Sequence, residues 1–334
     1  MRPGEADGTS AVDRLDLNTV PELNLEAIRR AWEGSSPRDL AAYPDPEATE
    51  LVEALARKLG VPAEWIVVGH GSDEILGLAV RTLVPYGGRA ATLNPTFAMY
   101  ARFLAAHGGA TVPVPEAKEL PRAALRRADA SVDLLASPNN PTGTAYPAAA
   151  YRALAASSPR PVVLDEAYHQ FAGQDLLPLA RAQPNVVVVR TFSKAYGLPG
   201  IRVGYAVGAP EIVQRLRAAR PPFSVSSFSI RAALFALADD RFVTRTVARA
   251  RAGRRTLARG LAGLGWRVWP SQANFLLIGP SPEAVRIHRE LGRRGIWVRR
   301  IDYPGGAAGG CLRITVGSPE QIARCLGALA EVGA

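Results

Sequence analysis

A chain of 334 residues, 48% of them hydrophobic, can bury a large core and is expected to form two domains, or one large domain with a smaller one. Its net charge of +10 is spread along an arginine-rich sequence, and no aromatic residues are interleaved in the densest basic stretch, 244–260, so we expect no nucleic-acid partner. The sequence has no apolar run near the ~20 residues of a membrane helix, no signal segment, and two cysteines without metal-site spacing. The sequence therefore predicts a cytoplasmic protein that neither spans a membrane nor binds a metal.

The first part of the chain alternates short apolar runs with helical patterns. A helix is expected at 72–84, and strands are expected at 65–69, 89–93, 133–137, 161–165, 185–189 and 202–208. Near-continuous apolar strands separated by helices indicate an α/β domain whose mostly parallel sheet is buried on both faces. In such sheets ligands bind at the carboxyl ends of the strands, so the residues after each run are the candidates for a site.

Beyond about residue 236 the pattern changes. The stretch 244–260 sets arginines against apolar residues at helical spacing and predicts an amphipathic helix, and strands are expected at 266–270, 273–279, 296–300 and 311–317. A glycine-rich loop is expected at 304–310. We therefore expect a large α/β domain over 41–235 and a smaller α+β domain over 236–334, with residues 1–40 forming an N-terminal arm and part of the small domain.

The first strand end is followed by small residues and the start of a helix, Gly69 to Glu74. Backbone N–H groups at such a turn can approach an anion, so Ser72 and Asp73 are candidates for a phosphate site. Glu74 stands where a dinucleotide fingerprint has its third glycine, and the Gly-Lys-Ser/Thr of a Walker loop is missing. An ordinary helix N-cap at Ser72 is an equal alternative.

Four later strand ends carry further candidates. Phe97 could cover a flat ring or be a core aromatic, and Asn140 lies in a rigid turn from which it could donate to a ligand hydroxyl. Asp165 ends a buried strand, where a carboxylate needs a cationic partner, and Tyr168 follows it by three residues. The strand 185–189 is followed by Thr191, Ser193 and Lys194, and Arg202 lies eight residues past the lysine.

Lys194 is unusual because only three of the 40 basic residues are lysines. An arginine is always protonated, whereas a lysine amine can lose its proton and form a Schiff base with a carbonyl compound, such as a substrate or pyridoxal phosphate. A surface lysine is the alternative for this position taken alone. The groups at the strand ends together suit one flat, phosphorylated, cationic aldehyde.

With these motifs the chain resembles the fold-type I pyridoxal-phosphate enzymes, and within them the histidinol-phosphate aminotransferase branch of the class I and II aminotransferases. The resemblance covers about residues 40 to 317 and is carried by the strings YPDP, GSDE, NPTF, SPNNPTG, DEAYHQF, TFSKAYGLPGIRVGY, ANF and CLRITVG. It implies an aminotransferase that passes an amino group from an amino acid or amino phosphate to a 2-oxo acid in two half-reactions. It also implies pyridoxal 5'-phosphate as cofactor and a homodimer with shared active sites.

The resemblance assigns roles residue by residue. Lys194 would bind the cofactor covalently and carry the proton, and Asp165 would pair with the pyridinium nitrogen. The other cofactor contacts would be Asn140 and Tyr168 at the ring oxygen, Phe97 on the ring, and a phosphate site of Ser72, Asp73, Thr191, Ser193 and Arg202, completed by Tyr43 of the other subunit. The substrate would be bound by Arg313, Arg299 and Asn18, with Arg300 as an alternative to Arg299.

Two departures lie beside the expected substrate. Relatives carry Asn-Glu-Asn-Pro where this chain has Asn18-Thr19-Val20-Pro21, and they carry an arginine at the position of Ala42. The alternative function on the same scaffold is a pyridoxal-phosphate decarboxylase or lyase similar to the threonine-phosphate decarboxylases, because the cofactor motifs do not decide which substrate bond breaks.

Overall fold

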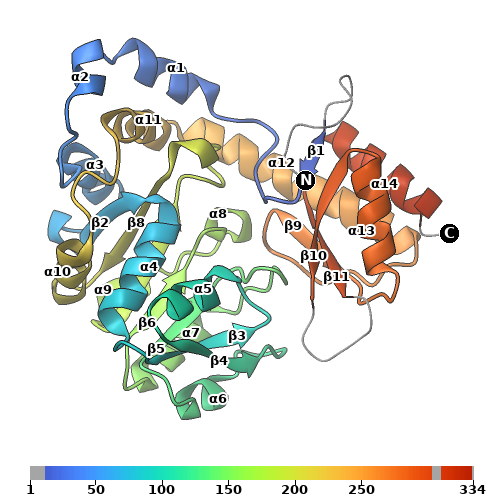
Figure 1. Ribbon diagram of the computed structural model, residues 1–334, viewed down its shortest axis with the longest axis horizontal. Helices are drawn as coiled ribbons and strands as arrows, with labels where there is room; N and C mark the ends of the chain where they lie inside the picture. Colours follow the sequence, from blue (N-terminus) through green and yellow to red (C-terminus); the bar gives the residue numbers. More distant parts are fainter. Residues whose placement is uncertain (1–11, 303–309, 333–334) are drawn as a thin grey trace.

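The computed structural model describes residues 12–302 and 310–332, which form two β-sheets flanked by helices (Figure 1). The large sheet has the order β2-β8-β7-β6-β5-β3-β4, and the small sheet has the order β1-β10-β11-β9. The large-sheet strands, in that order, are Ile66–His70, Val203–Gly208, Val186–Thr191, Val162–Asp165, Val132–Ala136, Arg89–Asn94 and Ala110–Pro115. The small-sheet strands are Asp13–Leu15, Ile296–Ile301, Cys311–Thr315 and Phe275–Ile278.

The large sheet is mostly parallel, as the sequence predicts. β8 runs antiparallel to both of its neighbours, β2 and β7, and every other pairing is parallel. The edge strand β4 was not among the predicted strands, because Pro113 and Pro115 interrupt its apolar pattern, and prolines are tolerated where a ladder hydrogen bond is not required.

Helices bury both faces of the large sheet. In β7, Val187 and Val189 pack into the cluster of α4, α5 and α10, whereas Val186 and Val188 pack into the cluster of α6, α7 and α9. Helices α4, α5 and α10 are Gly71–Leu83, Met99–Ala106 and Pro210–Ala219. Helices α6, α7 and α9 are Arg122–Arg127, Ala148–Ser157 and Leu177–Ala182. At the β2–β8 end, α1, α3 and α11 (Leu25–Glu33, Thr49–Leu59 and Ser227–Leu237) form a further cluster. The continuous apolar strands are thus explained by burial on two sides.

The small sheet packs against the helices α12, α13 and α14, which are Asp240–Gly263, Ala284–Arg293 and Pro319–Val332. The predicted amphipathic helix lies within α12, which runs from the side of α11 toward α14 (Figure 1). Parallel pairing of β1 with β10 brings the start of the described chain into this sheet. The remaining short helices are α2 (Pro37–Ala41), α8 (His169–Ala172), η1 (Ala63–Trp65) and η2 (Pro199–Ile201).

The strand predicted at 266–270 is wrong. Val268 forms only a single bridge with Ile278, next to a main-chain hydrogen bond from Trp269 to Leu277. Gly265, at a φ of +80°, sets a turn before this stretch, and Pro270 has no N–H with which to extend the ladder. The domain boundaries expected near residues 40 and 236 stay predictions, and the expected glycine-rich loop lies outside the described residues except for Gly310.

Within residues 12–302 and 310–332, no helix is both long and apolar enough to cross a bilayer.

The N-terminus of α4 is pressed against β8 at Gly204. A Cβ atom at this position would lie 2.4 Å from the backbone nitrogen of Ser72 and 2.6 Å from the carbonyl carbon of Gly71. Because both atoms belong to the main chain, neither can move aside as a flexible side chain would. Glycine at 204 therefore sets the approach of the α4 N-terminus to the end of the sheet.

We expect Gly204→Ala to lower the free energy of unfolding by about 1–3 kcal/mol, since the added methyl group overpacks a main-chain contact. Urea unfolding followed by circular dichroism measures the change. Gly200→Ala is the matched control, because a Cβ there meets no atom within 4 Å. Equal stability of the two variants would contradict this account of the contact.

Candidate active site

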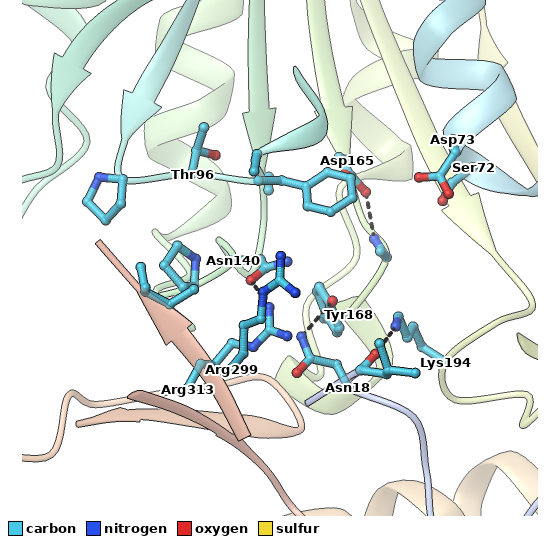
Figure 2. Close-up of a pocket in the computed structure, with 18 of the residues that line it drawn as sticks. Asn18, Ser72, Asp73, Thr96, Asn140, Asp165, Tyr168, Lys194, Arg299 and Arg313 are labelled. Carbon is cyan, nitrogen blue, oxygen red and sulfur yellow. Dashed lines mark hydrogen bonds between the residues drawn. The ribbon is translucent and has the colours of Figure 1, made fainter. Parts of the chain in front are cut away.

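A cavity of about 580 Å³ lies between the carboxyl ends of the large-sheet strands and the small sheet (Figure 2). Most of the residues predicted from the sequence line it together, although they come from distant parts of the chain. They are Asn18, Ser72, Asp73, Phe97, Asn140, Asp165, Tyr168, Thr191, Ser193, Lys194, Arg202, Arg299 and Arg313. Tyr43 does not line it: its side chain is 83% exposed and stacks on Phe223 with 4.8 Å between the ring centroids.

Lys194 follows β7 and extends into the cavity, where its Nζ donates a hydrogen bond of 2.9 Å to the carbonyl oxygen of Leu17 (Figure 2). Burial lowers the pKa of this amine to about 8, and the positive charges of Arg313 and Arg202 act in the same direction. The carboxylates of Asp73 and Asp165 act in the opposite direction without reversing the shift. Near neutral pH the neutral, nucleophilic form of the amine is therefore far more populated than it is in an ordinary lysine.

Asp165 ends β6 with its carboxylate at the cavity wall. Its Oδ2 accepts a hydrogen bond of 2.9 Å from the Tyr100 hydroxyl, and its Oδ1 accepts one of 3.1 Å from the Ala167 N–H. Burial raises the pKa of the carboxyl group to about 6, although both hydrogen bonds act to lower it. No arginine or lysine of the described chain is hydrogen-bonded to this carboxylate. A cation brought by a ligand would supply the missing partner.

Hydroxyl groups and a guanidinium gather at the start of α4. Arg202 Nη1 donates to Ser193 Oγ at 3.3 Å, and Arg202 Nη2 donates to Asp73 Oδ2 at 3.2 Å. Thr191 lines the same end of the cavity and accepts from the Ser193 N–H. Together with the positive end of the α4 dipole, these groups suit a dianion such as a phosphate.

Ser72 lies in the first turn of α4, whose N-cap residue is His70. The alternative in which Ser72 serves only as an N-cap is therefore wrong. The preceding Gly71 has a φ of +74°, and a Cβ on it would lie 2.6 Å from Nη2 of Arg202. Glycine at 71 thus leaves room for the guanidinium beside the helix start.

Arg313 enters the cavity from β11 and is buried. Its Nη1 donates to Asn140 Oδ1 and its Nη2 to the carbonyl oxygen of Asp16, both at 2.6 Å, while its Nε has no hydrogen-bond acceptor in the described chain. Burial lowers the pKa of the guanidinium, with a further contribution from the positive charge of Arg299. One donor of this cation therefore remains unused.

Arg299 lies opposite Arg313 in the β10–β11 pairing, and both point toward Asn140 (Figure 2). Arg299 has no hydrogen-bond or ion-pair partner among residues 12–302 and 310–332. The neighbouring Arg300 also lines the cavity but is paired with Asp302.

Asn18 is buried and fixes the N-terminal segment beside the cavity. Its side-chain amide donates to the Tyr168 hydroxyl at 3.0 Å, and its backbone N–H donates to Thr315 Oγ1 at 3.0 Å. Its carbonyl oxygen accepts from the side chain of Asn274, also at 3.0 Å. These bonds hold residue 18 at a φ of 55°, in the left-handed region that asparagine tolerates better than most residues.

Sequence reasoning missed several contributors to this site, among them Asp16, Leu17, Thr96 and Tyr100. Leu17 takes part through its carbonyl oxygen, which leaves no signal in the identity of a side chain. Tyr100 contacts Asp165 from the first turn of α5. The sequence signal that could have identified it was a tyrosine three residues after Phe97 in an otherwise apolar stretch.

Comparisons with known proteins agree with this geometry. The sequence model of the family described as "Aminotransferase class I and II" matches residues 12–329. The chain is 39% identical over 333 residues to a histidinol-phosphate aminotransferase of Roseiflexus castenholzii, covering 96% of this chain and 89% of the relative. It is 40% identical over 330 residues to histidinol-phosphate aminotransferase 2 of Ralstonia nicotianae, covering 95% and 87%.

A solved structure is similar over nearly the same extent. It is a histidinol-phosphate aminotransferase from Sinorhizobium meliloti in complex with pyridoxal 5'-phosphate, with a TM-score of 0.89 and 32% sequence identity. The superposition covers 97% of this chain and 91% of that chain.

The lowered pKa of Lys194 predicts how fast the ligand-free protein captures pyridoxal phosphate. The rate should rise as pH rises through about 8, because the neutral amine is the nucleophile. Arg313→Met removes a charge that lowers this pKa, so the midpoint should move to higher pH and the rate at pH 7.5 should fall several-fold.

Stopped-flow absorbance across a pH series measures both profiles. Arg300→Met is the control, since Arg300 is paired with Asp302 and is not among the charges that act on Lys194. An unchanged midpoint in Arg313→Met, or an equal shift in both variants, would contradict this electrostatic account.

Proposed function

Because the chain belongs to the class I and II aminotransferase family and works with pyridoxal phosphate, we propose that it transfers the amino group of histidinol phosphate to a 2-oxo acid, with glutamate as the product amino acid. The observation that carries the choice of substrate is the pair of adjacent guanidiniums, Arg299 and Arg313, that faces the cavity. Such a pair can bind the phosphate of one substrate and a carboxylate of the other.

The site fits the cofactor in three respects. Lys194 offers an amine of lowered pKa, Asp165 is a buried carboxylate without a cationic side chain bonded to it, and the start of α4 with Arg202 forms an anion site. A cationic ring that carries an aldehyde and a phosphate complements all three. When bound, pyridoxal phosphate supplies an electron sink next to the substrate carbon that carries the amino group.

Each group of the chain then has a task. We propose that Lys194 binds the cofactor and afterwards takes and returns the proton at the substrate carbon, while Asp165 pairs with the ring nitrogen. Asn140 and Tyr168 bind the ring hydroxyl and Phe97 covers the ring face. The phosphate is held by Ser72, Asp73, Thr191, Ser193 and Arg202.

The residues that bind the substrate can be assigned from the interaction partners of the arginines in the cavity. We assign the second substrate contact to Arg299, because it lies opposite Arg313 in the β10–β11 pairing, whereas Arg300 is paired with Asp302. Arg313 keeps an unused Nε donor and a neutral partner in Asn140, so an incoming anion can bind without separating an ion pair. Asn18 positions Tyr168 and borders the substrate from the N-terminal segment. The expected cytoplasmic location stays a prediction.

We further propose a homodimer. Several large exposed hydrophobic side chains lie on or beside α1 and α2 or in the segment before α11, and they are Leu23, Leu25, Trp32, Leu40, Tyr43 and Phe223. A second copy of the chain would cover this surface. Tyr43 lies on it, outside the cavity of its own chain, which fits a tyrosine that completes the phosphate site of the neighbouring subunit.

Tyr43→Ala should weaken the binding of pyridoxal phosphate about tenfold, through loss of one hydrogen bond to a charged group. Tyr86→Ala is the matched control, because Tyr86 is also 83% exposed but contacts His107 edge-on and does not line the cavity. Fluorescence titration with the cofactor gives the affinities, and analytical ultracentrifugation gives the mass. A monomer that binds the cofactor with full affinity would contradict the shared site.

Arg313→Ala should reduce kcat/KM for histidinol phosphate and for glutamate by about ten- to a hundredfold, since it removes a charge-assisted contact to each anion. Arg313→Lys should recover little, because an ammonium group cannot replace the planar fork. The assay follows the conversion of the enzyme to its amino form with each donor, together with product analysis by mass spectrometry.

The same assay tests the proposed substrate. If histidinol phosphate leaves the wild-type enzyme unchanged while a phosphorylated amino acid releases CO₂, the decarboxylase alternative replaces the proposed function.

A further inference from the structure

Tyr100 is a fully buried residue whose hydrogen bond to the candidate active site goes to Asp165. It lies in the first turn of α5, and its hydroxyl donates a hydrogen bond of 2.9 Å to Asp165 Oδ2. Its ring stands edge-on to Phe97, with 5.5 Å between centroids and an interplanar angle of 89°. Tyr100 therefore contacts two residues of the cavity wall without lining the cavity itself.

The hydroxyl is the part of Tyr100 that needs explanation. A phenylalanine would fill nearly the same volume in this apolar cluster without a polar atom, and a buried hydroxyl is unfavourable unless it is hydrogen-bonded. The bond to Asp165 satisfies it. Burial and the nearby negative charge raise the pKa of Tyr100 well above its usual value, so it remains protonated and remains a donor.

Asp165 receives one hydrogen bond on each carboxylate oxygen. The Ala167 N–H occupies Oδ1 and the Tyr100 hydroxyl occupies Oδ2, and each bond favours the ionised form against the effect of burial. Because the two donors lie on different elements, they also fix the plane of the carboxylate. A carboxylate oxygen can accept a further bond, which leaves capacity for a cation in the cavity.

We propose that Tyr100 is a positioning residue, whose hydroxyl keeps the Asp165 carboxylate ionised and oriented toward the ring nitrogen of the bound cofactor. This inference rests on the role proposed above for Asp165. It adds a residue that acts on the ring nitrogen of the cofactor through its carboxylate partner. The same side chain supports Phe97, so one tyrosine serves both the edge and the face of the ring.

The test compares Tyr100→Phe with the wild type in binding two cofactors, pyridoxal phosphate and its 1-deaza analogue, in which carbon replaces the ring nitrogen. We expect Tyr100→Phe to bind pyridoxal phosphate about tenfold more weakly at pH 6.5, because the carboxylate loses a charge-assisted bond. Affinity for the deaza analogue should match that of the wild type, since this ring has no nitrogen to pair. Fluorescence titration of the ligand-free protein measures both.

The pH dependence has a definite sign. The pKa of Asp165 is about 6, above its ordinary value, and losing the Tyr100 bond raises it further. At pH 6.5 the variant therefore has a smaller ionised fraction than the wild type, and the difference shrinks as pH rises to 8.5. The deficit in pyridoxal phosphate binding should be several-fold smaller at pH 8.5 than at pH 6.5.

Two further variants separate the possible outcomes. Tyr151→Phe removes the hydroxyl of another fully buried tyrosine that makes no hydrogen bond to Asp165, and it should bind both cofactors like the wild type. Asp165→Asn should lose the preference for pyridoxal phosphate over the deaza analogue. If Asp165→Asn keeps that preference, the proposed role of Asp165 fails, and this inference fails with it.

If Asp165→Asn loses the preference while Tyr100→Phe keeps wild-type affinities at both pH values, only the role of Tyr100 is overturned. An equal loss of affinity for both cofactors at both pH values would also overturn it, because that result reports a packing defect.

Discussion

The buried guanidinium of Arg313 is the contact through which the two sheets form one site. It extends from β11 of the small sheet, donates to Asn140 after β5 of the large sheet, and donates to the main chain at Asp16. A cation at this depth must be hydrogen-bonded, because an unpaired buried charge is strongly destabilising. Satisfying it therefore constrains the small sheet, the 137–143 turn and the N-terminal segment relative to one another. The same charge lowers the pKa of Lys194, so the contact that orders the site also prepares its nucleophile.

The electrostatics of the site favour a ligand of mixed charge. Burial lowers the pKa of Lys194 and raises that of Asp165, so each group is biased toward its neutral form by its surroundings. Two cations also line the cavity: Arg202 is paired with Asp73, and Arg313 is hydrogen-bonded to neutral acceptors. A phosphate bound near Arg202 and a cationic ring bound near Asp165 would favour the charged forms of Lys194 and Asp165. Cofactor binding and the ionisation of these groups are therefore linked.

Much of this arrangement could be predicted from the sequence, because apolar runs locate strands and parallel strands end at one edge. That rule alone brings Asn140, Asp165 and Lys194 together, although they lie up to 54 residues apart in the chain. It cannot find contributors such as the Leu17 carbonyl, which has no sequence signature, or the Tyr100 hydroxyl, whose partner is set by tertiary packing. The stretch 266–270 was predicted as a strand because its composition is that of one. A strand also needs a partner along its length, which Pro270 and the turn at Gly265 prevent.

The segment 16–18 meets the site through three consecutive carbonyl oxygens, which accept from Arg313, Lys194 and Asn274 in turn. Every amino acid carries a carbonyl, so replacing the side chains at 16 and 17 leaves these acceptors in place. Both residues also line the cavity. Substitutions at 16 and 17 can therefore change the rim of the cavity while the main-chain acceptors of the lysine and the arginine stay in place.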